Sequence, residues 1–186
     1  MLTEKKLHKI IDSCLNKDSK GEYELYEYCF PIFFIVCRRY TDCDEHAREA
    51  LNLAFHKVLI NLEKFDKSKS FNAWVSRIMV TTSIDEYRKK RRRAYIPLSE
   101  VVNFQLHKNE IEDSINEQNI LNYLDYLPPM GKKVFNLFAI DGYKHKEIAE
   151  MLFISENTSK WHVSESRKKL QKMLKKNEVL NLSTIL

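Results

Sequence analysis

Glycine and proline are scarce in this sequence of 186 residues, which has 3 Gly and 4 Pro. A β-sandwich needs many tight turns and a collagen-like chain needs a glycine at every third position, so both classes are excluded. No GxGxxG or GxxxxGK[ST] segment occurs, and the common phosphate-binding loops are therefore absent. The abundant Leu, Lys, Glu and Ile favour helices joined by short turns.

The sequence also lacks a long apolar run and any CxxC pair. The apolar stretch from Tyr28 to Cys37 is too short to span a bilayer, and we recognise no signal peptide, so we expect a cytoplasmic protein without membrane insertion. The four cysteines are consistent with buried or free thiols in a reducing compartment. Cys37, Cys43 and His46 could share a metal ion in principle, but no second ligand pair has metal spacing, and we expect no metal.

No set of residues with catalytic spacing is present. The six histidines are scattered and lie outside any Ser/His/Asp arrangement or metal motif, so we interpret them as surface or helix-face residues. We therefore expect neither an enzyme nor a cofactor. The histidines are His8, His46, His56, His107, His145 and His162.

Charge is distributed in three blocks. Residues 1–94 carry 19 Lys and Arg against 14 Asp and Glu, and residues 128–186 carry 11 against 6. Residues 95–127 carry 1 basic and 6 acidic side chains. Two basic blocks on either side of an acidic segment indicate two modules that bind a polyanion.

Apolar residues recur at helical spacing through most of the chain, which predicts an all-α fold. We expect two small helical domains, residues 1–94 and 128–186, joined by an acidic linker over 95–127 that contains one helix. Residues 18–21 and 65–70 have polar, turn-forming composition and should break the pattern. The expected helices cover residues 3–16, 22–40, 47–62, 71–93, 109–127, 130–140, 144–152 and 155–176.

The last two expected helices have the pattern of a helix-turn-helix. Ile148, Ala149 and Leu152 should face inward, Phe153-Ile154 should form the turn, and Ser155 should cap the second helix. A plain three-helix bundle would explain the apolar spacing equally well, but it leaves an outward tryptophan among cations unexplained. Polar, cationic and aromatic side chains suited to a major groove follow on the second helix. The DNA-binding residues predicted here are Ser155, Asn157, Thr158, Lys160, Trp161, His162, Ser164, Arg167 and Lys168.

Two stretches of this sequence resemble bacterial extracytoplasmic-function (ECF) sigma factors, the small specificity subunits of RNA polymerase. The first is FNAWVSRIMVTTSIDEYRKKRRR from Phe71 to Arg93, with its Trp, its Arg-Ile pair and an Asp three residues before a basic run. The second runs from Leu127 to Leu174, with the Leu-Pro-Pro opening, the Glu-Ile-Ala helix, the Ile-Ser turn and the Thr-x-Lys recognition helix. Their paired arrangement is a strong signal.

The resemblance implies a sigma factor that binds core RNA polymerase and directs promoter-specific initiation of transcription. The first domain would hold the polymerase and melt the minus-ten element, and the last would bind the minus-thirty-five element as duplex. It also implies an anti-sigma factor as a partner, and we expect a monomer when the chain is free. Core docking is assigned to Glu49, Asn52 and His56, and contacts with the melted strand to Lys67, Ser68, Lys69, Ser70, Asn72, Arg88, Lys89, Lys90 and Arg91.

Several positions depart from the family pattern. The third helix retains one acid as Glu49 but has Leu53 where a second acid is usual. Phe153 stands at a turn position often held by glycine, which would be awkward if its φ is positive. Ser159 replaces a buried aliphatic residue, and Thr81 replaces an asparagine.

Two rival functions are weighed against a sigma factor. A helix-turn-helix regulator acting without polymerase would leave residues 22–93 unexplained, because they carry no ligand-pocket or phospho-acceptor signature. A membrane-associated helical protein could use the basic run Arg88–Arg93, but the second, distant basic block disfavours it.

Overall fold

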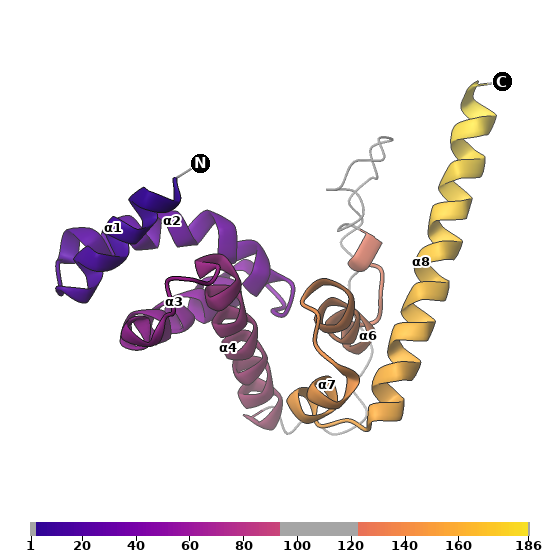
Figure 1. Cartoon of the computed structure of the whole chain (residues 1–186). Helices are drawn as coiled ribbons and strands as arrows, with labels where there is room; N and C mark the ends of the chain where they lie inside the picture. The colour runs from indigo at the N-terminus through magenta and orange to yellow at the C-terminus, as the bar shows by residue number, and fades with distance from the viewer. Residues whose placement is uncertain (1–2, 94–122, 186) are drawn as a thin grey trace. The chain divides into compact units, whose positions relative to one another are not determined.

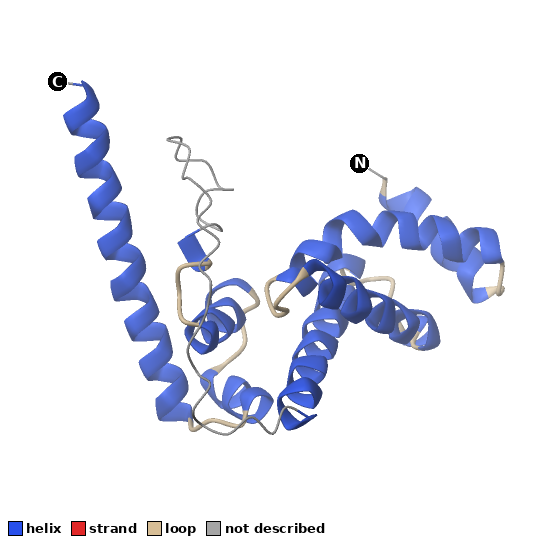
Figure 2. Cartoon of the chain, turned by 180° about the vertical axis from the view of Figure 1, so that it is seen from behind, coloured by secondary structure: helices blue, strands red, loops and turns tan. Residues whose placement is uncertain are grey.

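The structure is a computed structural model that describes residues 3–93 and 123–185. Within those two ranges the chain forms helices and turns and no strand, as Figures 1 and 2 show. It divides into two compact units, Met1–Tyr95 and Ile96–Leu186. The predicted linker and the helix expected over 109–127 lie outside the described residues, except for their last five. The all-α fold class is confirmed.

Over residues 3–93, the first unit contains four α-helices and a short 3-10 turn. The helices α1 and α2 span Glu4–Leu15 and Ser19–Arg38, α3 spans Asp44–Ile60, and α4 spans Phe71–Arg93, with the turn η1 at Leu62–Lys64. All four helices predicted in this region are confirmed, with ends shifted by up to three residues. The helix α2 continues through Pro31, which removes one backbone donor from its interior.

The prediction that residues 18–21 interrupt the helical pattern is wrong for residues 19–21, because α2 begins at Ser19. The carboxylate of Asp18 caps α2 by accepting from the backbone N–H of Lys20 at 3.1 Å, and it also accepts from Ser13 Oγ at 2.5 Å. These hydrogen bonds, that from Ser13 first, lower the pKa of Asp18. The tight connection falls one residue earlier, where Lys17 adopts a φ of 58°.

The core of the first unit lies between α2, α3 and α4. Three alanines of α3 are buried, and their small side chains let α4 and α2 approach this helix closely. Phe65 and Phe71 pack edge to face with ring centroids 5.3 Å apart, and Trp74 lies 5.2 Å from Phe65. Trp74 therefore belongs to an aromatic cluster that holds both ends of the loop over residues 66–70. The buried alanines are Ala47, Ala50 and Ala54.

The second unit contains α6 (Pro129–Phe135), a π-helical turn η3 (Asn136–Ile140), α7 (His145–Leu152) and the long helix α8 (Glu156–Ile185). The helix predicted over 130–140 therefore changes its hydrogen-bond pattern halfway. The backbone N–H of Asp141 donates to the carbonyl of Asn136 at 3.0 Å, which is the five-residue step of a π-turn. The helix α8 extends nine residues beyond its predicted end at 176.

Candidate nucleic-acid interface

The helix-turn-helix expected at residues 144–176 is formed by α7 and α8. Phe153 closes α7 in the left-handed region with a φ of 55°, so the strained conformation anticipated for this residue is present. The backbone N–H of Ile154 donates to the carbonyl of Ala149 at 3.1 Å. Ser155 then caps α8, because its Oγ accepts from the backbone N–H of Thr158 at 2.9 Å.

The side of α8 that faces the core is the side predicted from the sequence. Ser159 and Val163 are buried, together with Ile148 and Leu152 of α7. Trp161 is 58% exposed, so this large ring faces solvent on the opposite side. Thr158 and His162 are half-buried at the boundary, whereas the other predicted contacts are exposed: Ser155, Asn157, Lys160, Ser164, Arg167 and Lys168.

The two exposed lysines of this surface are paired with carboxylates of α8 itself. Lys160 Nζ lies 2.7 Å from Glu156 Oε1, and Lys168 Nζ lies 2.8 Å from Glu165 Oε1. The Lys160 hydrogen bond lowers the pKa of Glu156. Exposed pairs of this kind contribute about 0–1 kcal/mol, so both lysines can exchange a carboxylate for a phosphate or a base edge at little cost.

Arg167 is held differently, by an aromatic ring. Its guanidinium carbon lies 5.7 Å from the ring centroid of Phe138 in η3. Phe138 stacks on His145 at the start of α7, with ring centroids 4.4 Å apart and planes inclined by 13°. His145 Nδ1 shares a hydrogen bond of 3.0 Å with Oγ of the buried Ser159. The buried hydroxyl of Ser159 is thus satisfied by this histidine.

A groove lies beside Trp161, with a volume of about 430 Å³. Leu127, Pro128 and Gly131 at the start of α6 line one side, and Trp161 and three lysines of α8 line the other. His162 lies at the same place, and burial there lowers its pKa. The lysines are Lys168, Lys169 and Lys172.

In the first unit, the loop predicted to contact a melted strand is tied to the surrounding helices. Lys67 forms an ion pair with Asp12 of α1, and Asn72 Oδ1 accepts from Tyr28 OH at 2.9 Å. Asp66 accepts from both the backbone N–H and the Oγ of Ser68, at 3.0 and 2.7 Å, and these bonds lower the pKa of Asp66. Ser70 Oγ accepts from the N–H of Ala73 at 3.3 Å and so starts α4. Lys69 is exposed beside Asp66, at 3.6 Å.

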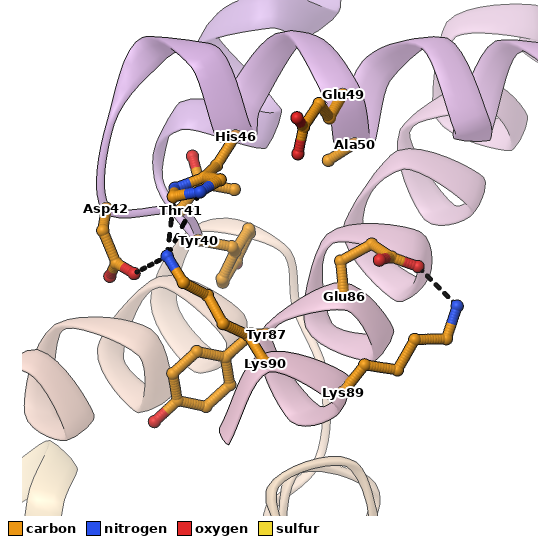
Figure 3. Close-up of a pocket in the computed structure, with 10 residues that line it drawn as sticks. All are labelled: Tyr40, Thr41, Asp42, His46, Glu49, Ala50, Glu86, Tyr87, Lys89 and Lys90. Carbon is orange, nitrogen blue, oxygen red and sulfur yellow. Dashed lines mark hydrogen bonds and ion pairs between the residues drawn. The ribbon is translucent and has the colours of Figure 1, made fainter. Parts of the chain in front are cut away.

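The basic run at the end of α4 has acidic partners as well. Arg88 pairs with Asp85 at 3.2 Å and Lys89 pairs with Glu86 at 2.6 Å, both on α4 itself. Lys90 reaches across to Asp42 at 3.5 Å and to the ring nitrogens of His46 at 3.2 Å (Figure 3). The end of α4 is thereby held to the turn between α2 and α3. Arg91 is exposed.

The three residues predicted to dock the polymerase all lie exposed on α3. Asn52 Oδ1 accepts from Tyr26 OH of α2 at 3.0 Å, which fixes its side chain. Glu49 lines a pocket of about 210 Å³ together with Lys89 and Lys90, so a predicted docking residue and two predicted DNA contacts meet there (Figure 3). His56 is one turn further along α3 than Asn52.

The cysteines are free thiols in the structure, as expected. Cys14, Cys29 and Cys37 are buried, whereas Cys43 is half-buried with its Sγ 2.9 Å from His46 Nδ1. Nowhere in residues 3–93 and 123–185 do three or more His, Cys, Asp or Glu side chains cluster as metal ligands would. Among the same residues, no helix has the length and apolarity required to cross a bilayer.

Sequence reasoning did not single out the stack beneath Arg167. Phe138 and His145 are seven residues apart and separated by a turn, so no periodic pattern links them. It also gave no role to the exposed apolar side chains Leu53 and Ile60 of α3, which are 47% and 66% exposed. For Leu53 a signal was available, since the resemblance implies an acid at this position.

Comparison with known families yields two matches, one within the first basic block and one that begins in the acidic segment and extends through most of the second basic block. Residues 25–93 match Sigma-70 region 2, and residues 117–170 match Sigma-70, region 4. The match over region 2 accounts for the part of the chain that a plain helix-turn-helix regulator leaves unexplained.

Relatives from Bacillus subtilis (strain 168) agree with these matches. RNA polymerase sigma factor SigZ is 29% identical over 134 residues, covering 68% of this chain and 71% of the relative. ECF RNA polymerase sigma factor SigW is 23% identical over 186 residues, covering 91% and 99%. RNA polymerase sigma factor SigV is 24% identical over 147 residues, covering 79% and 87%.

Two solved structures are similar at 17% identity. The sigma factor RpoE in complex with the anti-sigma factor NepR from Bartonella quintana has a TM-score of 0.48, covering 82% of this chain and 96% of that one. CnrH in complex with the cytosolic domain of CnrY has a TM-score of 0.46, covering 89% and 95%. With region 2 and region 4 both present in family order, the chain belongs to the sigma-70 family as an ECF sigma factor, a subunit that binds core RNA polymerase and promoter DNA and directs the initiation of transcription.

Proposed function

We propose that the two units divide promoter recognition between them. Residues 1–94 hold the core enzyme and melt the minus-ten element, residues 95–127 connect the units, and residues 128–186 bind the minus-thirty-five element as duplex. The observation that supports this division most strongly is that each basic block has its own buried core. We further propose that the protein acts in the cytoplasm, has no catalytic activity of its own and is regulated by an anti-sigma factor.

In the C-terminal unit, α8 enters the major groove with its N-terminus towards the DNA backbone. The capped first turn leaves backbone N–H groups and a partial positive charge for a phosphate. Lys160 and Trp161 contact base edges, because they follow one turn later on the exposed side. Arg167 and Lys168 lie two turns further along α8 and contact the backbone.

In the N-terminal unit, the loop over residues 67–70 together with Asn72 receives a base of the melted strand, and the basic end of α4 follows the phosphates. The ion pairs of Arg88 and Lys89 lie within α4, that of Lys90 reaches Asp42, and all three are exposed in part, so phosphates can replace their carboxylate partners. Trp74 supports the loop from below rather than stacking on a base, since it packs on Phe65.

Core polymerase docks on the exposed face of α3. Glu49, Asn52 and His56 supply the polar contacts, and the exposed Leu53 lies among them on the same helix. Glu49 also borders the pocket that contains Lys89 and Lys90, so docking and strand contact take place on adjoining surfaces.

Run-off transcription with core RNA polymerase tests this function. We expect the full chain and core enzyme together to start transcripts at a small set of genomic promoters, and either component alone to start none of them. Assembly with the polymerase that yields no promoter-dependent transcript would contradict it. Truncated templates lacking the upstream element should lose initiation, which separates the roles of the two units.

A further inference from the structure

Arg167 differs from Lys160 and Lys168, the other two cations predicted to contact DNA on α8, in how it is held. Lys160 and Lys168 are paired with Glu156 and Glu165, and DNA must displace those carboxylates. Within the described residues Arg167 forms no ion pair, and its guanidinium lies over the Phe138 ring instead. A ring face attracts the cation without neutralising it, and its N–H donors stay available.

The ring that carries Arg167 is itself fixed in place. Phe138 is half-buried in the π-helical turn η3 and stacks almost parallel on His145. His145 is the first residue of α7 and is hydrogen-bonded through Nδ1 to the buried Ser159 of α8. The stack therefore connects η3, α7 and α8, and its position follows the helix-turn-helix as a rigid part of it.

We propose that Phe138 is a positioning residue for promoter binding, which holds the Arg167 guanidinium ready for a backbone phosphate. An exposed arginine samples many rotamers, and binding must select one of them at an entropic cost. The ring limits that sampling before DNA arrives, so less entropy is given up on binding. This inference rests on the proposed function, in which Arg167 contacts the DNA backbone.

The experiment uses four variants of the full chain assembled with core polymerase. Promoter affinity is measured against salt concentration for Phe138→Leu, Phe138→Tyr, Arg167→Ala and the double variant Phe138→Leu/Arg167→Ala. We expect Phe138→Leu to weaken binding roughly two- to fivefold on all promoters, the size of an exposed cation–π contact, and Phe138→Tyr to match the wild type. In the Arg167→Ala background, Phe138→Leu should have no further effect.

Two results overturn the inference. One is a Phe138→Leu variant with wild-type affinity, and the other is an equal loss of affinity with and without Arg167, which would mean that Phe138 only stabilises the fold. Should Phe138→Leu fail to fold, as judged by circular dichroism, Phe138→Met replaces it under the same criteria. If instead Arg167→Ala leaves affinity and salt dependence unchanged, the phosphate contact in the proposed function is wrong, which is a distinct failure.

Discussion

Gly21 of α2 lies so close to Ser13 of α1 that a Cβ atom at Gly21 would stand 2.5 Å from Ser13 Oγ and 3.1 Å from the backbone nitrogen of Cys14. Real Cβ atoms essentially never stand within 3.0 Å of another atom, and Ser13 Cβ, which would lie 2.6 Å away, cannot rotate out of the way. The absence of a side chain at Gly21 is thus what lets α1 and α2 pack closely at their connection.

This close contact determines whether replacing Gly21 by alanine raises or lowers the free energy of unfolding. Alanine in a helix interior is favoured over glycine by about 1 kcal/mol, but overpacking typically costs about 1–3 kcal/mol. We therefore expect Gly21→Ala to lower the free energy of unfolding, measured by urea denaturation. The neighbouring exposed Lys20→Ala serves as the control and should change stability by no more than about 0.5 kcal/mol. A stabilised Gly21→Ala variant would show that α1 can shift freely.

Thiol reactivity should separate the four cysteines. Burial raises the pKa of Cys29 to about 12 and those of Cys14 and Cys37 to about 11. At pH 8 these thiols are protonated and shielded, and the thiolate is the reactive form. Iodoacetamide should therefore label the half-buried Cys43 first, with all four labelled in urea, as followed by mass spectrometry. Cys43→Ser should abolish the rapid labelling, and rapid labelling that persists in this variant would refute the assignment.

Reversing the charge at Glu49 should weaken assembly with core polymerase and leave the fold intact. Its carboxylate is exposed on α3, so the change removes a docking group without disturbing the core. We expect affinity to fall at least about tenfold for Glu49→Lys, equivalent to about 1.4 kcal/mol, in a fluorescence binding assay. Glu63→Lys, which reverses the charge of another exposed glutamate in η1, is the matched control. Equal affinities for the two variants, at equal helical content, would remove Glu49 from the docking surface.

The basic end of α4 is tested through the salt dependence of promoter binding. Replacing the four residues Arg88–Arg91 by alanine should reduce the slope of log affinity against log salt by about one unit for each phosphate that is no longer neutralised. Affinity should fall alike on all sequences. The control removes the same charge from the surface of α1 and α2, with alanine at Lys5, Lys6, Lys9 and Lys20. An unaltered slope would mean that the run is only a solvated helix end.

Helices and their buried faces could be predicted from the sequence, because apolar spacing reports them directly. The orientation of the recognition helix followed as well, since the cap at Ser155 and the inward Val163 fix its start and its rotation. The function of Gly21 was missed because glycine suggests a turn, and only the packed neighbour reveals a close approach. The π-turn at residues 136–140 was missed because helical spacing does not distinguish it from an α-helix over so few residues.

The candidate site was predicted in part. The exposed side chains of α8 could be named from residue type and spacing. Some partners of the predicted contact residues could not be named, because they lie far away in the sequence. Arg167 of α8 contacts Phe138 of η3, and Lys90 of α4 contacts Asp42 in the turn between α2 and α3. Such contacts depend on how the helices cross, which local patterns do not specify.

We propose that Lys160 and Trp161 of α8 determine which upstream promoter element is bound. A base contact is worth about 1–3 kcal/mol of discrimination, whereas a phosphate contact discriminates hardly at all. The most direct test is a selection from randomised promoters at fixed salt, with the polymerase assembled on each variant beside the wild type. Lys160→Ala and Trp161→Ala should change the preferred upstream bases, and Arg167→Ala should weaken every promoter similarly. If the Lys160 and Trp161 variants select the same bases as the wild type, α8 does not recognise the promoter through these side chains.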